Sequence, residues 1–190
     1  MRRIWTLLVA VLLTGLLTAT TVACTADESG APTREAANGD TVNDADVEFA
    51  AELLRHDAES LLLVDTTLGR ELDSELAAVV ESTREELLLS IEEMAALLEE
   101  WGEEVPETAR DHTNSHAEDE DDFHPWDDLA AAPQEEFQRV WIAEMTSRHQ
   151  DAAALATTAA EDGLAVTERA AGVEAARSER AEELAALPIG

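Results

Sequence analysis

The sequence predicts an all-α protein, a four-helix bundle in which one long crossover linker joins two repeated αα-hairpins. Three observations lead to this prediction. Apolar residues recur at helical spacing through four long segments, and no segment shows the alternation typical of a strand. Residues 49–64 also recur as residues 141–156, at an offset of 92 (141 − 49). A repeat at one fixed offset indicates one supersecondary unit that is used twice.

The N-terminal residues 1–23 are predicted to be a secretory signal. Arg2 and Arg3 precede a long apolar run, which is typical of exported proteins. Residues 21–24 resemble a bacterial lipobox, whose cysteine, here Cys24, is lipidated and begins the mature chain. The alternative is an uncleaved anchor with an incidental thiol, and either interpretation exports the protein. We therefore expect a bacterial lipoprotein on the outer face of the cell membrane, with the membrane as its partner through a lipid anchor on Cys24.

The charge of the chain limits its partners. The 190 residues carry a formal net charge of −31 and include no lysine. Loss of Arg2 and Arg3 with the signal would change this to −33 (−31 − 2). Such an excess of carboxylates repels nucleic acid and anionic lipid headgroups, so we expect no nucleic acid partner. Cys24 is the only cysteine, so no intramolecular disulfide can form.

The first part of the mature chain leads into a helical hairpin. Residues 24–43 are small and polar and predict a flexible tether after the lipidated cysteine. Asn43 or Asp44 offers an N-cap for a first helix over about residues 44–67. A second helix is predicted over about 73–100 and ends at a glycine suited to a left-handed cap.

The second hairpin follows a long connection. Residues 103–134 hold three prolines and an acidic run, and they predict an acidic linker. The third and fourth helices are expected over about 135–160 and 165–186. Two hairpins with one long crossover form one of the known topologies of four-helix bundles.

Each copy of the repeat carries a polar dipeptide in the middle of an apolar helix. The dipeptides are His56-Asp57 in the first copy and Arg148-His149 in the second. Helical spacing places all four side chains on inward-facing stripes. A buried and unpaired charge is costly. We therefore expect these residues to pair with one another, to bind a ligand, or to lie nearer to water than the pattern suggests.

Several residues give the chain a family likeness. They are Asp46-x-x-Phe49, the dipeptide seven residues after Phe49, the ending from Met94 to Trp101-Gly102, and, in the second half, Leu129, Phe137, Trp141 and Met145. Over roughly residues 44–187 the chain resembles the family of the domain of unknown function 305 (DUF305). The resemblance implies a ferritin-like helical bundle, and some members of the family are linked to copper or silver binding outside the cytoplasm. The family pattern places methionines and a His-His pair in each repeat, a soft set that suits Cu(I).

This chain departs from the family pattern at those positions. One histidine of each pair is replaced, and the paired methionines are Glu52-Leu53 and Glu144-Met145. The donors that remain are richer in oxygen and nitrogen, closer to what zinc, Cu(II) or nickel accept. The metal ligands implied by the resemblance are therefore His56, Asp57, His149, Glu52, Glu144 and Met145.

A metal-free arrangement of the same dipeptides is the alternative. Arg148 cannot lose its proton to become a ligand. If the two repeats face each other, Asp57 is able to pair with Arg148 or His149. We expect an ion pair between Asp57 and Arg148 across the bundle core.

The linker offers a second place for a metal. His112, His116 and His124 flank the acidic run of residues 118–122. His-x-x-x-His would suit a divalent ion if the segment were helical, whereas a solvated acidic loop would bind none.

No combination of residues predicts an enzyme. A di-iron site needs Glu-x-x-His on two helices, whereas Glu52 and His56 stand four residues apart and Glu144 and His149 five. No glycine-rich phosphate loop is present, and the one cysteine falls in the signal region. Two functions stay open. One is an extracytoplasmic metal-binding lipoprotein, and the other is a lipid-tethered module that kept the fold and lost the metal, acting as a scaffold or partner-binding domain.

Overall fold

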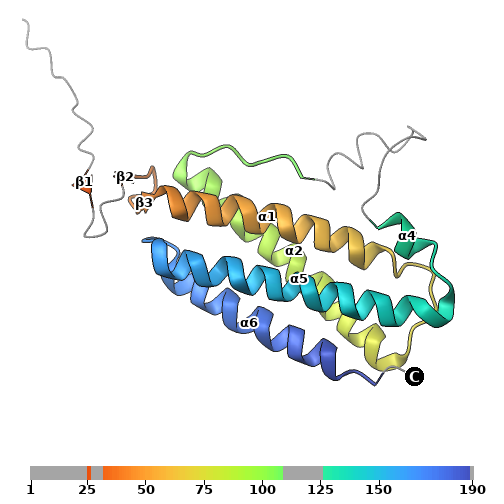
Figure 1. Ribbon diagram of the computed structural model, residues 1–190. Coiled ribbons are helices and arrows are strands. Elements are labelled where there is room, and N and C mark those ends of the chain that lie inside the picture. Colours follow the sequence, from red (N-terminus) through yellow and green to blue (C-terminus); the bar gives the residue numbers. More distant parts are fainter. Residues whose placement is uncertain (1–24, 27–31, 109–125, 189–190) are drawn as a thin grey trace, which may run out of the picture.

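Four long helices form the body of the protein (Figure 1). They are α1 (Asp44–Asp65), α2 (Ser74–Trp101), α5 (Gln134–Asp162) and α6 (Thr167–Ala186). The computed structural model describes residues 25–26, 32–108 and 126–188. The expected signal over residues 1–23, the expected lipidation site Cys24 and the linker histidines His112, His116 and His124 lie outside these residues.

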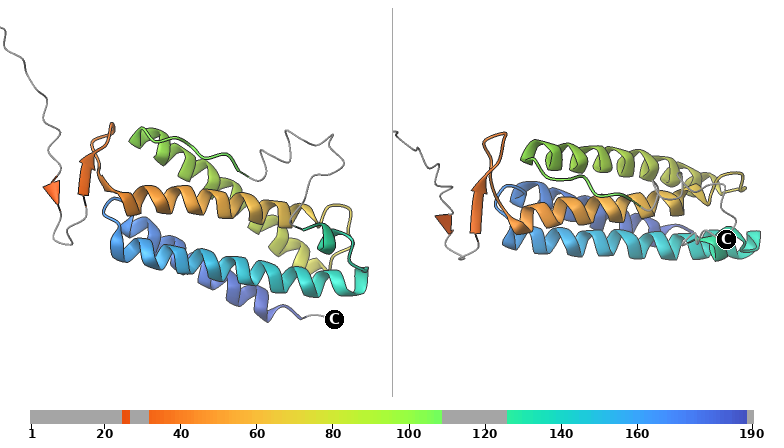
Figure 2. Two further views of the ribbon diagram at one scale, coloured as in Figure 1. Left: turned by 45° about the horizontal axis from the view of Figure 1, so that its top comes forward. Right: turned by 90° about the horizontal axis from the view of Figure 1, so that it is seen from above.

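The helices are connected as a four-helix bundle with one long crossover. Helix α1 packs against α2 and α5, and α5 packs against α6. The views of Figure 2 show α1 and α5 side by side along their length. These two helices run in opposite directions. The side-chain amide of Asn43 at the start of α1 donates to the backbone carbonyl of Asp162 at the end of α5, 2.7 Å away. The predicted all-α bundle is confirmed.

Local signals set the ends of the first two helices. Asn43 is the N-cap of α1 and forms a capping box with Asp46, in which each side chain accepts the other's backbone N–H at 3.0 and 2.8 Å. Gly102 ends α2 in a left-handed conformation with φ of 77°. A residue with a Cβ is strained there, which explains the glycine.

The expectation of a flexible tether over residues 24–43 is wrong for its second half. Strands β2 (Pro32–Glu35) and β3 (Thr41–Asn43) pair antiparallel, and β1 (Thr25–Ala26) pairs with β2. The β2–β3 hairpin turns at Gly39, whose φ is 94°. Val42 is fully buried against the bundle. The strands were missed because they are only two to four residues long and carry one buried apolar side chain between polar neighbours.

The apolar core falls into two clusters, one toward each end of the bundle. The cluster at the β-hairpin end includes Val42, Phe49, Leu53, Leu54, Met94, Leu98, Trp101 and Ala152. The cluster at the other end includes Leu61, Leu63, Val64, Leu87, Phe137, Trp141, Met145 and Leu184. A short helix, α4 (Asp127–Ala130), which the predicted linker did not anticipate, covers the second cluster with Leu129.

Among the described residues, no helix combines the length and the apolar composition needed to cross a bilayer.

Candidate functional site

The two predicted dipeptides lie halfway along the bundle, between the apolar clusters. On α1, Asp57 falls between Leu54 of one cluster and Leu61 of the other. His149 on α5 falls between the clusters in the same way. The charged and polar side chains that meet here are called the mid-bundle polar cluster. They are His56, Asp57, Ser60, Glu86, Arg148, His149, Arg177 and Arg180.

A buried ion pair joins α1 to α6 at the centre of this cluster. Asp57 is fully buried, and its Oδ2 accepts a hydrogen bond of 2.7 Å from Nη2 of Arg177, which is itself 3% exposed. Glu86 on α2 lies 3.0 Å from the other guanidinium nitrogen of Arg177 and 3.3 Å from Arg180. Three helices are therefore tied together by opposite charges, which offset the cost of burying each one.

The expected ion pair between Asp57 and Arg148 is wrong. Arg148 instead lies 3.0 Å from Glu59, donates to the hydroxyl of Ser60 at 3.0 Å and donates to the backbone carbonyl of His56. Its side chain remains 16% exposed. The long side chain reaches along the surface of α1 toward water, which is the usual way in which arginine avoids full burial.

The two histidines occupy different environments. His56 is partly exposed, and its Nδ1 lies 3.4 Å from Asp57 Oδ1. His149 is buried, and burial together with Arg177, Arg180, His56 and Arg148 lowers its pKa from 6.5 to about 3. At neutral pH this imidazole is uncharged. The Nε2 atoms of both histidines are buried and have no hydrogen-bond partner in the described part of the chain.

The remaining expected metal ligands do not converge on the histidines. Glu52 pairs with Arg55 on the surface, and Glu144 is also exposed. Met145 is fully buried in the apolar cluster. Within the described residues, no three His, Cys, Asp or Glu side chains are arranged to hold a metal ion.

Arg177, Arg180 and Glu86 are the charged members of the cluster that the sequence prediction missed. Arg177 lies in the middle of the buried stripe of α6, with Ala170, Ala181 and Leu184. An arginine within an otherwise apolar stripe indicates a buried partner of opposite charge. That signal was present in the sequence, but nothing in it says that the partner is Asp57, 120 residues away.

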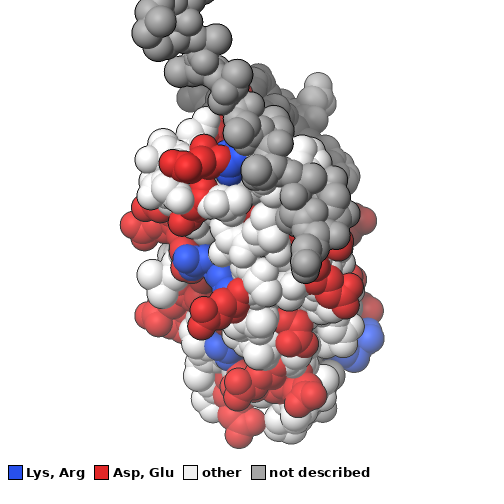
Figure 3. Space-filling view, turned by 90° about the vertical axis from the view of Figure 1, so that its left-hand side faces the viewer, with Lys and Arg blue, Asp and Glu red and all other residues white. Residues whose placement is uncertain are grey.

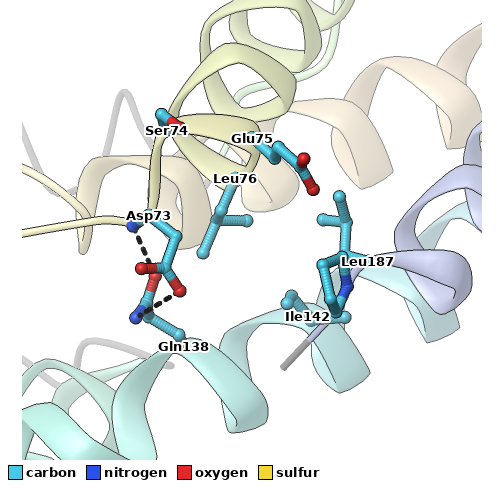
Figure 4. Close-up of a pocket in the computed structure, with 8 residues that line it drawn as sticks. Asp73, Ser74, Glu75, Leu76, Gln138, Ile142 and Leu187 are labelled. Carbon is cyan, nitrogen blue, oxygen red and sulfur yellow. Dashed lines mark hydrogen bonds between the residues drawn. The ribbon is translucent and has the colours of Figure 1, made fainter. Parts of the chain in front are cut away.

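The two hairpins also hold each other at their ends. Asp46 at the start of α1 is buried, and its Oδ1 accepts backbone N–H groups of Leu164, Ala165 and Val166 before α6, at 2.8, 3.0 and 3.1 Å. Gln138 is its repeat equivalent (138 − 46 = 92). At the opposite end of the bundle, Gln138 accepts the backbone N–H of Asp73 before α2 at 2.9 Å, as Figure 4 shows. Each copy of the repeat thus orders the other copy's second helix.

Figure 4 also shows the polar cavity at this end, where α2 begins. It has a volume of about 200 Å³ and includes Asp73, Glu75, Leu76, Gln138 and Leu187 in its lining.

A larger, mainly apolar groove lies on the surface beside α4 and the start of α5. Its volume is about 530 Å³. Its lining includes the apolar residues Trp126, Leu129, Pro133 and Val140 and the carboxylates Asp128, Glu136 and Glu144. The indole N–H of Trp126 donates to the carbonyl of Glu59 on α1 at 3.2 Å and fixes one wall. We call this surface the Trp126 groove.

These features define a helical-bundle domain that is built from two copies of one hairpin and has charged residues paired at its centre. The chain belongs to the DUF305 family, since the family model described as Domain of unknown function (DUF305) matches residues 46–187. This confirms the family resemblance of the sequence. No curated protein and no solved structure matches the chain.

Proposed function

We propose that this protein is an exported, lipid-anchored, non-enzymatic module that binds a protein partner. Its mid-bundle polar cluster is occupied by ion pairs and binds no metal. One observation carries the metal-free part of this proposal. The carboxylate of Asp57, which would be an oxygen ligand, is bonded to Arg177 inside the core. A carboxylate held in this way neutralises an arginine and is not free to bind a cation.

The charges around the histidines support the same conclusion. Arg148, Arg177 and Arg180 all lie close enough to His149 to lower its pKa. Three guanidinium groups oppose the approach of another cation, and none of them can act as a ligand.

The burial of the two innermost residues of the cluster supports a role other than catalysis. Asp57 and His149 are buried, and neither lines the Trp126 groove or the cavity at the start of α2. A substrate would have to part the helices to reach them. The ion pairs therefore stabilise the fold, and binding takes place on the surface.

The Trp126 groove is the surface that suits a partner. Its apolar floor and its carboxylates at positions 128, 136 and 144 fit an extended protein segment with an apolar side chain next to arginine or lysine. Burial of the apolar side chain supplies affinity, and the carboxylates select the basic neighbours.

A defined pair of peptides tests this groove. We expect a labelled peptide with leucine between arginines to bind the mature domain in fluorescence anisotropy, and the same peptide with glutamates not to bind. Glu144→Arg should weaken binding about tenfold, equal to about 1.4 kcal/mol. Glu52→Arg is the matched control, because Glu52 is the repeat equivalent of Glu144 (144 − 52 = 92) and does not line the groove. Equal loss in both variants would indicate a general charge effect and no groove.

The N-terminal sequence supports the lipid anchor, and mass spectrometry tests it. We expect the exported protein to begin at a lipidated Cys24 and to leave membranes only with detergent. An unmodified Cys24, or a chain that keeps residues 1–23, would contradict the anchor.

One observation favours a second candidate, transition-metal binding by His56 and His149. The Nε2 atoms of both are buried without a hydrogen-bond partner among the described residues, and Nδ1 of His56 faces the carboxylate of Asp57. A carboxylate on one ring nitrogen leaves the lone pair of the other nitrogen available to a metal.

Equilibrium dialysis of the mature domain against Cu, Zn and Ni separates the two candidates. The metal-free proposal expects no uptake that depends on His56 or His149. Replacement of His112, His116 and His124 removes any contribution of the linker. The second candidate would be established by uptake of one ion per chain that meets two conditions. The uptake persists when the three linker histidines are replaced, and it disappears in both His56→Ala and His149→Ala.

A further inference from the structure

The β-hairpin that follows the predicted lipid anchor in sequence is packed onto one end of the bundle. Val42 of β3 is fully buried and Ala36 nearly so, and both belong to the apolar cluster at that end. Arg34 of β2 pairs with Glu103 just after α2. The indole N–H of Trp101 donates to Asp40 in the hairpin turn at 3.1 Å. The hairpin is thus fixed to α1 by the chain and to α2 by side chains.

Little chain separates Cys24 from this hairpin. Cys24 directly precedes β1, whose Thr25 pairs with Thr33 of β2. Even without that pairing, the eight residues from Cys24 to Pro32 (32 − 24) reach at most about 28 Å. Helix α1 has 22 residues and is about 33 Å long. The anchor therefore stays near the end of the bundle that holds the hairpin.

We propose that the protein stands upright on the membrane, with its β-hairpin end against the lipid surface and the loop between α1 and α2 pointing away. This orientation rests on the lipid anchor of the proposed function. It places the Trp126 groove, which adjoins the start of α5 at the end opposite the hairpin, toward the surroundings (Figure 1). The groove is then presented to protein partners and is kept clear of the bilayer.

The charge of the molecule disfavours every contact with anionic lipid that the anchor does not enforce. Figure 3 views the hairpin end, and carboxylates are spread over that face with few arginines among them. With a formal charge of −31 on the chain, electrostatic repulsion opposes contact between a flank of the bundle and anionic lipid. The hairpin end comes close only because the anchor holds it, and repulsion keeps the rest of the bundle off the bilayer.

Two exposed leucines at opposite ends provide a test. Leu164 lies beside the start of α1, where its N–H donates to Asp46, and Leu68 follows the end of α1; their side chains are 39% and 71% exposed. The full-length protein carrying Leu164→Cys or Leu68→Cys is labelled with a maleimide fluorophore and reconstituted into phosphatidylcholine–phosphatidylglycerol vesicles that contain a headgroup nitroxide lipid. We expect the label at position 164 to lose most of its fluorescence and the label at position 68 to keep most of it. Equal quenching, or stronger quenching at position 68, would overturn the orientation.

The wild-type protein separates failure of the orientation from failure of the anchor. The lipid on Cys24 should make the wild-type chain float with the vesicles. Because a lipidated Cys24 has no free thiol, the same chain should take up no maleimide. A wild-type chain that is labelled and stays in solution would overturn the anchor and the orientation with it. If the wild-type chain floats without being labelled and the two cysteine variants are quenched equally, the anchor is supported and only the orientation is overturned.

A matched pair of variants tests the hairpin itself. Val42→Asp introduces a charge at a buried position, whereas Thr41→Asp does so at the exposed position before it. With helical circular dichroism unchanged, Val42→Asp should reduce the difference in quenching between the two labels, and Thr41→Asp should preserve it. The same difference in both variants would show that the hairpin does not orient the bundle.

Discussion

The two copies of the repeat bury equivalent positions and fill them with different chemistry. His56 and Arg148 are equivalent and both keep 16% of their side-chain surface exposed. Asp57 and His149 are equivalent and are 0% and 2% exposed. Yet Asp57 is paired with an arginine, whereas His149 is buried as a neutral base with a lowered pKa. The repeated hairpin determines which positions face the interior, and the residues around them determine which charges can be kept there.

The difference arises from the second helix of each hairpin. Helices α2 and α6 contribute Glu86 and Arg177 to the cluster, and these two residues carry opposite charges. The two copies therefore surround their buried positions with different charges. Since α6 supplies the arginine, the carboxylate of Asp57 has a partner of opposite charge in the core, whereas the same arginine disfavours His149 as a cation.

The largest effect is expected when Arg177 is removed. Arg177→Ala leaves Asp57 buried without its partner and should lower the free energy of unfolding by about 3–5 kcal/mol. Arg148→Ala is the control, and it should cost about 1 kcal/mol, because Arg148 and Glu59 are both partly exposed. Urea unfolding of the two variants measures both values.

A double variant shows whether the loss belongs to the pair. Arg177→Met combined with Asp57→Leu should cost much less than Arg177→Ala, because no unpaired charge remains. An Arg148→Ala variant as unstable as Arg177→Ala would mean that the partly exposed arginine supports the core as much as the buried one does.

The ends of the bundle give a second comparison between the copies. Asp46 accepts four backbone N–H groups, three before α6 and one at Asn43, whereas its equivalent Gln138 accepts one. Asp46→Ala should therefore lower the free energy of unfolding by about 3 kcal/mol, since several buried donors lose a charged acceptor. Gln138→Ala should cost less than about 1 kcal/mol. Equal losses, measured by thermal unfolding, would mean that the extra bonds of the carboxylate add no stability.

The sequence predicted most of the architecture because periodicity carries that information. Apolar spacing located the four long helices, and the repeat pointed to His56-Asp57 and Arg148-His149 as the polar positions of an apolar core. The pairing within the core could not be predicted in the same way. Asp57 had two candidate partners on α5, and the residue that binds it, Arg177, comes from a helix on which the repeat is weak.

The β-hairpin shows a different limit of sequence analysis. Its residues are small and polar, as in a tether, and only Val42 and Ala36 contribute to the core. The hairpin is stabilised by contacts with Trp101 and Glu103, more than fifty residues further along the chain. Local composition holds no information about such contacts.

The buried histidine gives the stability a predictable dependence on pH. Arg177, Arg180, His56 and Arg148 face His149, and together with burial they hold its pKa at about 3, against 6.5 in the unfolded chain. Because the folded pKa is the lower one, the contribution of His149 is complete above pH 6.5 and is lost as the pH falls from 6.5 toward 3. At about pH 5 the loss should be about 2 kcal/mol, at about 1.4 kcal/mol per pH unit.

Comparison with a variant isolates this contribution from the many surface carboxylates. When the pH is lowered from about 7 to about 5, the free energy of unfolding of the wild type should fall by about 2 kcal/mol more than that of His149→Gln. Identical pH dependence in the two proteins would mean that His149 does not remain neutral in the folded state.

The smallest effect is expected at the equivalent glutamates, and it separates the surface of the repeat from its core. Glu52 pairs with Arg55 three residues along α1, and both side chains are about half exposed, while Glu144 is exposed on α5. Exposed ion pairs are screened by solvent and salt, so Glu52→Ala and Glu144→Ala should each change the free energy of unfolding by no more than about 0.5 kcal/mol. Neither substitution should alter the uptake of Cu, Zn or Ni in dialysis, because neither carboxylate reaches the histidines in the folded chain. Loss of bound metal in both variants would instead mean that α1 and α5 turn these carboxylates inward when a metal is present. In that case the two copies would differ less in function than their buried residues imply.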